Sequence, residues 1–136
     1  MQPGPWAQRP RVRPRIWPSL VYSTYLGGRG GTYGGDYGDA IALDSSGDAF
    51  ITGAAYSADF PVTPGAFQTK NKAAADEGPN AFLSKLNPQG SALLYSTYLG
   101  GSYKDTATGI ALGSSDNAYI KGWTCPSDFP VTYTVK

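Results

Sequence analysis

The sequence predicts an all-β protein built from repeated, four-stranded antiparallel sheets. Three observations lead to this fold class. Part of the chain occurs twice, which is the mark of a repeat architecture. Short runs of β-branched and aromatic residues alternate with turn residues, as strands and hairpins do. The repeated unit also contains no obvious helix, because no part of it has the apolar period of a long amphipathic helix.

Two pairs of segments define the internal repeat. Residues 20–28 (LVYSTYLGG) return 73 residues later as residues 93–101 (LLYSTYLGG), with eight of nine positions identical. Residues 41–63 return 69 residues later as residues 110–132, with thirteen of 23 positions identical. The two offsets differ because the first copy has a longer Gly-rich stretch, residues 29–38, and insertions between repeats map to loops.

Each unit of the repeat predicts four strands joined in part by tight turns. The strands are expected at residues 41–43, 49–53, 81–86 and 93–99. Residues 45–48 (SSGD) and residues 87–90 (NPQG) have the composition of tight turns, so the first and second strands and the third and fourth strands are predicted to form hairpins.

A long connection, residues 54–80, separates the two predicted hairpins. Unstructured loops of this length are uncommon inside compact domains, so we expect this one to be pinned to the sheet. Phe60, Val62 and Phe67, around a Thr-Pro-Gly turn, are the expected anchors. Residues 72–77 predict at most one helical turn.

Both faces of the predicted fourth strand carry apolar side chains, which predicts a sheet covered on both sides. Four-stranded sheets that repeat and stack face to face are typical of β-propeller blades. The tyrosines of the LVYSTYL and LLYSTYL segments are therefore expected in the core: Tyr22, Tyr25, Tyr95 and Tyr98.

Several linked motifs resemble the SBBP-type bacterial β-propeller repeat. They are YSTYLGG at 22–28, IALDSSG at 41–47, AFITG at 49–53, DFPVTPGAFQT at 59–69 and AFLSKLN at 81–87. The resemblance covers residues 20–136. It implies propeller blades of a large secreted or cell-surface bacterial protein, and it implies no catalytic residues.

The domain organisation expected from the repeat is incomplete. Residues 1–19 predict a basic, Pro/Arg-rich disordered tail, and residues 20–28 the outer strand of a preceding blade. Residues 41–101 predict one complete blade, and residues 110–136 the first half of the next. Since a propeller needs about four to eight blades, about one and a half blades indicate a fragment of a longer array. Exposed edges predict self-association or marginal folding; a compact two-sheet sandwich is the structural alternative.

The residue inventory excludes several chemistries. Histidine is absent and Cys125 is the only cysteine, so a Ser-His-Asp or Cys-His set, a His-ligated zinc and an intrachain disulfide are excluded. Asp44 and Asp48 flank a segment that is better explained as a hairpin turn than as a cation loop. Asp59 and Asp128, at equivalent positions of the repeat, are better explained as turn acceptors than as a catalytic pair. No catalytic, cofactor-binding or metal site is predicted.

Four further features bear on a binding role. Tyr56 and Trp123 follow the second strand of each unit, where loops are exposed, and are the candidate surface ligand contacts. Residues 1–19 hold four arginines and no acid, which indicates a solvated tail or, as the alternative, an anion-binding arm. The Gly-rich residues 29–35 are better explained as a flexible joint than as a phosphate cradle, because no helix follows. Cys125 is expected to be an inert or weakly reactive thiol.

The leading functional hypothesis is a non-enzymatic propeller module, a structural or interaction scaffold at the bacterial cell exterior. Its expected partners are other propeller blades, a second copy, a protein or a glycan. The alternatives are a fragment of a propeller hydrolase or lyase with catalytic groups in missing blades, a nucleic-acid binder through the arginine tail, which is not expected, or a truncated chain without activity. No transmembrane stretch or signal peptide is evident in the sequence.

Overall fold

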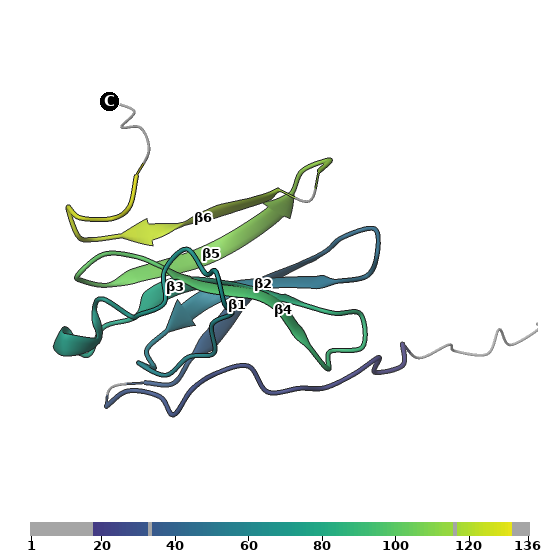
Figure 1. Cartoon of the computed structure of the whole chain (residues 1–136), viewed down its shortest axis with the longest axis horizontal. Coiled ribbons are helices and arrows are strands. Elements are labelled where there is room, and N and C mark those ends of the chain that lie inside the picture. The colour runs from purple at the N-terminus through teal and green to yellow at the C-terminus, as the bar shows by residue number, and fades with distance from the viewer. Residues whose placement is uncertain (1–17, 33, 116, 132–136) are drawn as a thin grey trace, which may run out of the picture.

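The computed structural model describes residues 18–32, 34–115 and 117–131. Within them, six strands form two antiparallel sheets (Figure 1). The larger sheet has the order β1-β2-β3-β4 and the smaller one pairs β5 with β6. The strands are β1 (Tyr37–Leu43), β2 (Ala49–Ala55), β3 (Asn80–Leu86), β4 (Leu93–Leu99), β5 (Asp105–Leu112) and β6 (Ala118–Thr124). The predicted all-β fold class, with one four-stranded sheet and the first two strands of another, is confirmed. Residues 1–17 of the predicted tail lie outside the described residues.

Both predicted hairpins form. Gly47 in the β1–β2 turn has φ 84° and Gly90 in the β3–β4 turn has φ 65°, a left-handed conformation that glycine adopts without steric cost. The strand β1 begins earlier than predicted, at Tyr37, because a register shift at Gly38 and Ala40 lets the chain continue along β2.

The same bulge recurs in the second unit. The register of β5 on β6 shifts between Ala107 and Gly109. A glycine faces the bulge on the neighbouring strand in both cases: a Cβ on Gly53 would collide with the carbonyl oxygen of Tyr37, and one on Gly122 with that of Thr106. Glycine is therefore required there because the two backbones approach closely.

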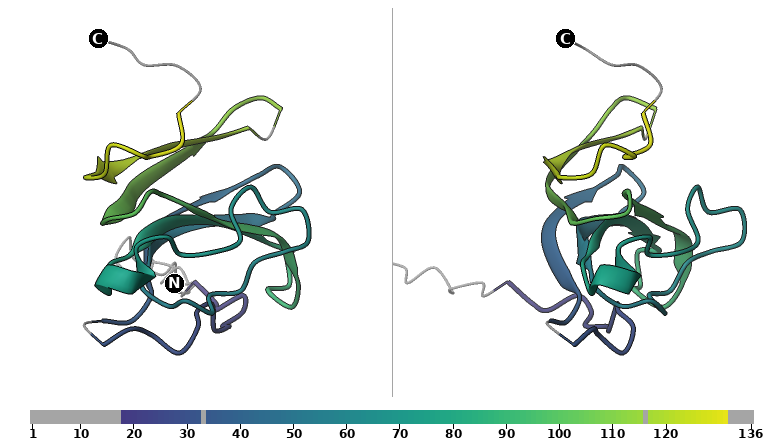
Figure 2. Two further views of the ribbon diagram at one scale, coloured as in Figure 1. Left: turned by 60° about the vertical axis from the view of Figure 1, so that its left-hand side comes forward. Right: turned by 90° about the vertical axis from the view of Figure 1, so that its left-hand side faces the viewer.

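One face of the larger sheet carries the aromatic core. Phe60 packs against Phe82 at 4.6 Å between ring centroids and against Tyr98 at 5.8 Å. Ala55 completes this buried cluster, and Leu26, Ile51 and Val62 pack against it. Residues 18–28, which form no strand in the structure, run along this side of the sheet as extended chain (Figures 1 and 2).

The tyrosines differ in their burial. Tyr98 is fully buried, as predicted, and Tyr22 and Tyr95 are half-buried. The core prediction is wrong for Tyr25, whose side chain is fully exposed. Tyr25 occupies the repeat position of Tyr98, and the described residues supply no neighbouring strand that would cover it.

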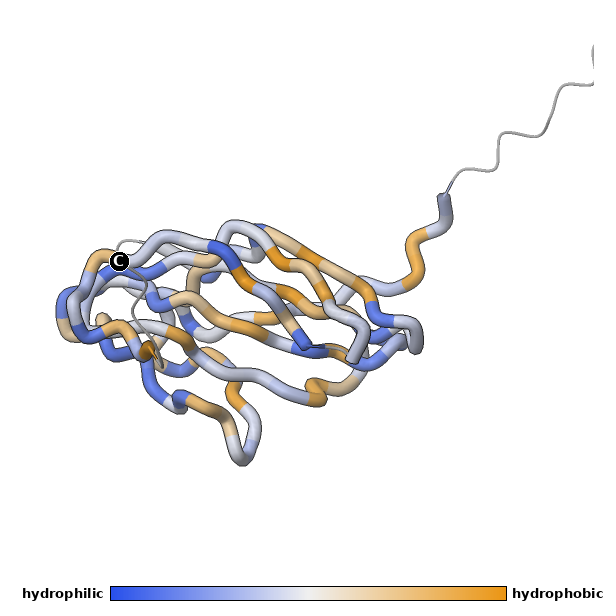
Figure 3. Tube along the Cα trace, turned by 90° about the horizontal axis from the view of Figure 1, so that it is seen from above, coloured by the Kyte–Doolittle hydropathy of each residue, from blue (hydrophilic) through white to orange (hydrophobic). Residues whose placement is uncertain are grey.

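The opposite face of the larger sheet is covered by the smaller one. The hairpin β5–β6 stacks above it with β5 nearest to β1 and β2 (Figures 1 and 2). Asp105 and Ala107 are buried in this contact, whereas most of β6 is exposed. Hydrophobic residues follow the strands, and the ends of the molecule are more hydrophilic (Figure 3).

The long connection between β2 and β3 is pinned to the sheet, as predicted. It runs beside β4, where the Thr63 N–H donates to the Ser96 carbonyl and the Tyr98 N–H to the Gln68 carbonyl, each at 3.1 Å. Phe60 and Val62 act as anchors, but Phe67 does not, because its side chain is 66% exposed. The buried side-chain amides of Gln68 and Asn71 take that role: the Gln68 amide bonds to Asn80 and Gly100, and the Asn71 amide donates to the carbonyls of Ala55 and Gly78. One short 3₁₀ turn, η1 (Ala74–Asp76), forms within the predicted helical stretch.

Candidate functional site

The chain that follows the glycine pair Gly27 and Gly28 and leads into the larger sheet is called the first joint. Two aspartates hold it by hydrogen bonds. Asp36 accepts the backbone N–H of Gly28 at 2.7 Å, and Asp59 accepts that of Arg29 at 2.9 Å. Ser57 connects Asp36 to the backbone of this joint. Its N–H and its hydroxyl donate to Asp36, and the hydroxyl accepts the N–H of Gly30. Three successive N–H groups, beginning at the second glycine of the pair, are thus satisfied by side chains of the following unit.

The chain that follows the glycine pair Gly100 and Gly101 and connects the two sheets, called the second joint, repeats this arrangement. Asp105 accepts the N–H of Gly101 at 2.8 Å, and Asp128 accepts the N–H of Ser102 at 2.9 Å. The two pairs of aspartates, Asp36 with Asp59 and Asp105 with Asp128, occupy equivalent positions 69 residues apart. Asp59 and Asp128 are therefore acceptors, but for a distant segment of the chain rather than for a local turn.

Close packing explains why each joint needs glycine. A Cβ on Gly28 would collide with Asp59 Oδ1, and one on Gly101 would collide with Asp128 Oδ1. Neither glycine has a positive φ. Their role is therefore to let the carboxylate approach the backbone N–H of the next residue, and not to turn the chain.

The two joints differ at one position. Pro126 occupies the repeat position of Ser57, and proline has neither an N–H nor a hydroxyl to donate. Asp105 Oδ1 is consequently buried without a hydrogen-bond partner among the described residues. The other oxygen, Oδ2, has two hydrogen-bond donors: the Gly101 N–H and the buried side-chain amide of Asn80.

Buried amides connect the second joint to the larger sheet. Asn80, at the start of β3, donates to the Gly101 carbonyl at 3.0 Å and accepts from Gln68 Nε2 at 2.8 Å. Gln68 in turn accepts the N–H of Gly100 through Oε1. The smaller sheet is therefore fixed to the larger one by a hydrogen-bond network as well as by apolar packing.

Two groups near the joints have shifted pKa values. Hydrogen bonding from the Ser102 backbone N–H lowers the pKa of Asp128 below its usual value. Burial raises the pKa of Tyr98 to about 12. The Tyr98 hydroxyl donates to the Ser57 carbonyl at 2.6 Å and accepts the Phe60 N–H at 3.0 Å, so the core tyrosine also fixes the loop that carries Asp59.

The two aspartates of the β1–β2 turn form ion pairs with a lysine on β3. Lys85 Nζ on β3 lies 2.9 Å from Asp44 Oδ2 and 3.0 Å from Asp48 Oδ2. Asp44 Oδ1 also accepts the N–H groups of Ser46 and Asp48, which confirms the hairpin-turn interpretation. The Lys85 hydrogen bond lowers the pKa of Asp44, and the same contact raises that of Lys85.

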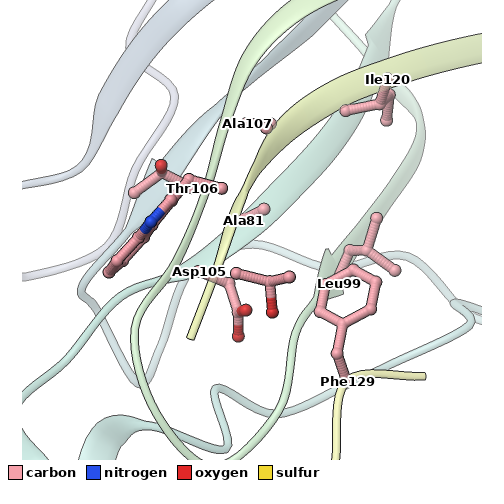
Figure 4. Close-up of a pocket in the computed structure, with 10 residues that line it drawn as sticks. Ala81, Leu99, Asp105, Thr106, Ala107, Ile120 and Phe129 are labelled. Atoms are coloured by element: carbon pink, nitrogen blue, oxygen red, sulfur yellow. The ribbon is translucent and has the colours of Figure 1, made fainter. Parts of the chain in front are cut away.

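A pocket of about 220 Å³ opens between the two sheets (Figure 4). Its wall comes from β3, β4, β5 and β6 and from Phe129. Trp123, one of the two predicted ligand contacts, lines this pocket and is 54% exposed. Tyr56, the other, lies elsewhere, edge-on to Tyr37 at 6.1 Å between ring centroids, and does not line it.

The pattern of strands, bulges and joints defines a repeat module of the β-propeller class. The family model for the SBBP beta-propeller repeat matches residues 21–61 and 94–130, more than half of the chain. The chain belongs to this family, as the resemblance of its motifs implied. No curated protein matches the chain closely enough to be counted as a relative. Its sheets are from here on called blades: β1–β4 is the complete blade and β5–β6 the half-blade.

The described part of the chain shows neither a group of three or more His, Cys, Asp or Glu residues able to hold a metal ion nor a helix long and apolar enough to cross a membrane. Cys125 is free and exposed.

Sequence reasoning missed most of the joint. It singled out Asp59 and Asp128, but not Asp36, Asp105 or the amides that serve them. The sequence did contain a signal for Asp36 and Asp105, because these two residues recur at the same 69-residue offset as the strands. No comparable signal marked Gln68 and Asn80, whose counterparts in the second unit would lie after residue 136.

Proposed function

We propose that this chain is a non-enzymatic scaffold segment of a multi-blade β-propeller, carried by a bacterial protein that is secreted or displayed at the cell surface. One observation carries the proposal: the same joint, with acceptors at equivalent positions, occurs before the complete blade and before the half-blade. A joint that repeats fixes each blade rigidly on the last, and a rigid stack of blades is suited to presenting a surface.

The carboxylates that could suggest catalysis all have structural partners, which supports this role. The carboxylates of Asp44 and Asp48 are bound to Lys85, and those of Asp59 and Asp128 bind backbone N–H groups of the joints. Such side chains position the chain instead of facing a shared substrate cleft. The ligand contact that we retain from the sequence is Trp123, which presents an aromatic surface beside the open half-blade, where a protein or glycan partner can stack.

The proposal is tested by supplying the strands that a repeat module requires. A dye attached to Cys125, the only cysteine, reports on the half-blade of the full chain. A synthetic peptide of residues 79–101, which contains the sequences of β3 and β4, is titrated in. We expect saturable binding with a change in dye emission. The control peptide carries Phe82→Ser and Tyr98→Ser and should not bind.

Failure of the intact peptide to bind would contradict the role as a segment of a longer blade array. The exterior location is tested separately, by treating whole cells of the native bacterium with a protease that cannot enter them. Digestion of the protein in intact cells is expected, and complete protection would contradict the location.

A further inference from the structure

The pocket beside Trp123 is lined by residues that are equivalent to those around the aromatic core of the complete blade. In the complete blade, the cluster around Phe82 and Tyr98 is walled by Leu26, Ile51 and Phe60. The repeat positions of these three wall residues are Leu99, Ile120 and Phe129, and all three line the pocket (Figure 4). Among the described residues, the half-blade contains no counterpart of Phe82 or Tyr98. Phe129 is accordingly half-buried, whereas Phe60 is 3% exposed.

An open strand edge borders this pocket. In the complete blade, β2 pairs with β1 on one edge and with β3 on the other, and Phe82 lies opposite Gly53. In the half-blade, β6 pairs with β5 only, among the described residues, and Gly122 takes the place of Gly53. An edge of this kind offers unpaired N–H and C=O groups to a further strand. A ring on that strand would lie opposite Gly122, as Phe82 lies opposite Gly53.

One buried acceptor in the wall of the pocket also lacks a hydrogen-bond donor. Asp105 lines the pocket, is fully buried, and has no donor to Oδ1 among the described residues. A buried acceptor of this kind is costly until it is paired. A tyrosine brings a hydroxyl donor with its ring and a phenylalanine does not, so the pocket favours tyrosine.

We propose that residues 20–26 of a second copy of this chain add to the free edge of β6 and place Tyr25 in this pocket. The segment has the strand-forming sequence of β4. On β6 it would occupy the place that β3 occupies on β2, with Tyr25 opposite Gly122 as Phe82 is opposite Gly53. The Tyr25 side chain is fully exposed, and Leu20 and Val21 of the same segment are 81% and 83% exposed. The segment carries no charge and β6 carries only Lys121, so no like charges oppose the contact.

This contact is head-to-tail. Residues 20–26 lie on one side of the complete blade and β6 lies on the other (Figures 1 and 2). Each copy therefore offers one Tyr25 segment and one open pocket at opposite ends, and such heterologous contacts build rings or open filaments. The inference rests on the proposed function, because it assumes that the half-blade accepts strands of its own repeat type.

The test is the oligomeric state of the full chain by sedimentation velocity over a range of concentrations. We expect assemblies larger than a monomer that grow with concentration, and a monomer for Tyr25→Ser. Tyr103→Ser is the matched control, because Tyr103 is exposed but lies outside the segment and does not line the pocket. A chain that stays monomeric, or a Tyr25→Ser variant that associates like the parent, would overturn the proposal.

A second comparison tests the hydroxyl. Tyr25→Phe keeps the ring and should weaken association about fivefold, the value of one typical hydrogen bond of about 1 kcal/mol. In the Pro126→Ser background, a serine supplies the donors to Asp105 that Ser57 supplies to Asp36, so the Tyr25→Phe substitution should no longer weaken association. Equal association of Tyr25→Phe and the parent would overturn the assignment of Asp105 as the hydroxyl acceptor.

The two proposals fail in different ways. If the chain is monomeric but still binds the peptide of residues 79–101, the second-copy inference is overturned and the proposed function stands, with a following repeat as the occupant. If neither the peptide nor a second copy binds, both are contradicted.

Discussion

Ser57 and Pro126 stand at the same position of two successive repeats, yet only Ser57 donates hydrogen bonds to the aspartate beside it. Its N–H and hydroxyl satisfy both oxygens of Asp36. Pro126 can donate neither, and Asp105 Oδ1 remains buried and unpaired among the described residues. The second joint is therefore the less satisfied of two joints that are otherwise alike.

Restoring the missing donors should stabilise the chain. Pro126→Ser is expected to raise the free energy of unfolding by about 1 kcal/mol, because it pairs a buried acceptor. The converse change, Ser57→Pro, removes donors from Asp36 and should lower it by roughly 2 kcal/mol or more. Urea denaturation followed by circular dichroism measures both. If Pro126→Ser is neutral or destabilising, Asp105 is not limiting at this joint.

The double glycines should tolerate alanine poorly at the positions that face the joint aspartates. Gly28→Ala and Gly101→Ala place a methyl group against Asp59 and Asp128, and each should destabilise the chain by roughly 1 to 3 kcal/mol, as overpacking does. Gly35→Ala is the control, since a Cβ there meets nothing within 4 Å. Thermal melts compare the three variants, and equal tolerance at all three positions would contradict the close approach.

The hydroxyl of Tyr98 should contribute to stability at neutral pH and lose that contribution in alkali. Tyr98→Phe is expected to cost about 1 to 3 kcal/mol, because the Ser57 carbonyl and the Phe60 N–H lose their shared partner. Burial raises the pKa of Tyr98 from 10.0 to about 12. The unfolded chain therefore ionises first, and the free energy of unfolding should fall as the pH rises from 10 toward 12.

Urea denaturation at neutral and alkaline pH measures this dependence. The Tyr98→Phe variant should lose the part of the alkaline decline that comes from Tyr98, while the other tyrosines titrate in both proteins. An identical decline in variant and parent would contradict the role of the buried hydroxyl.

The charge cluster of the β1–β2 turn should shape the pH dependence at both extremes. The pKa of Asp44 is lowered from 3.8 by its Lys85 hydrogen bond, so its stabilising contribution is present above pH 3.8 and is lost as the pH falls through the folded-state value. The pKa of Lys85 is raised from 10.5 by the same contact, so its contribution is present below pH 10.5 and is lost above the folded-state value.

Removing the lysine tests this cluster. Lys85→Met should lower the denaturation midpoint at neutral pH, because it leaves the buried carboxylate of Asp44 without its cation. It should also flatten the stability profile at both ends of the pH range. Lys121→Met is the control, since the described residues give Lys121 no ion pair. Equal midpoints for Lys85→Met and the parent would contradict the role of the cluster.

Much of the fold was predictable because the repeat and the turn chemistry are local properties of the sequence. Gly47 and Gly90 mark the hairpins, and the strands follow from residue type. The joint was harder to predict, because Asp59 and Arg29 lie 30 residues apart and meet only through the fold. Tyr25 was misplaced because the same sequence motif is buried where a third strand flanks it and exposed where none does.

The most direct test of the central claim, that β6 is the counterpart of β2 with one edge open, is amide hydrogen exchange of the Tyr25→Ser variant of the full chain, in which a second copy does not add to that edge. We expect slow exchange along β2, which is paired on both edges, and faster exchange at the β6 amides that face away from β5. Adding the peptide of residues 79–101 should slow exchange in β6 and leave β2 unchanged. Equal protection of β2 and β6 without the peptide, or no change in β6 with it, would contradict the claim.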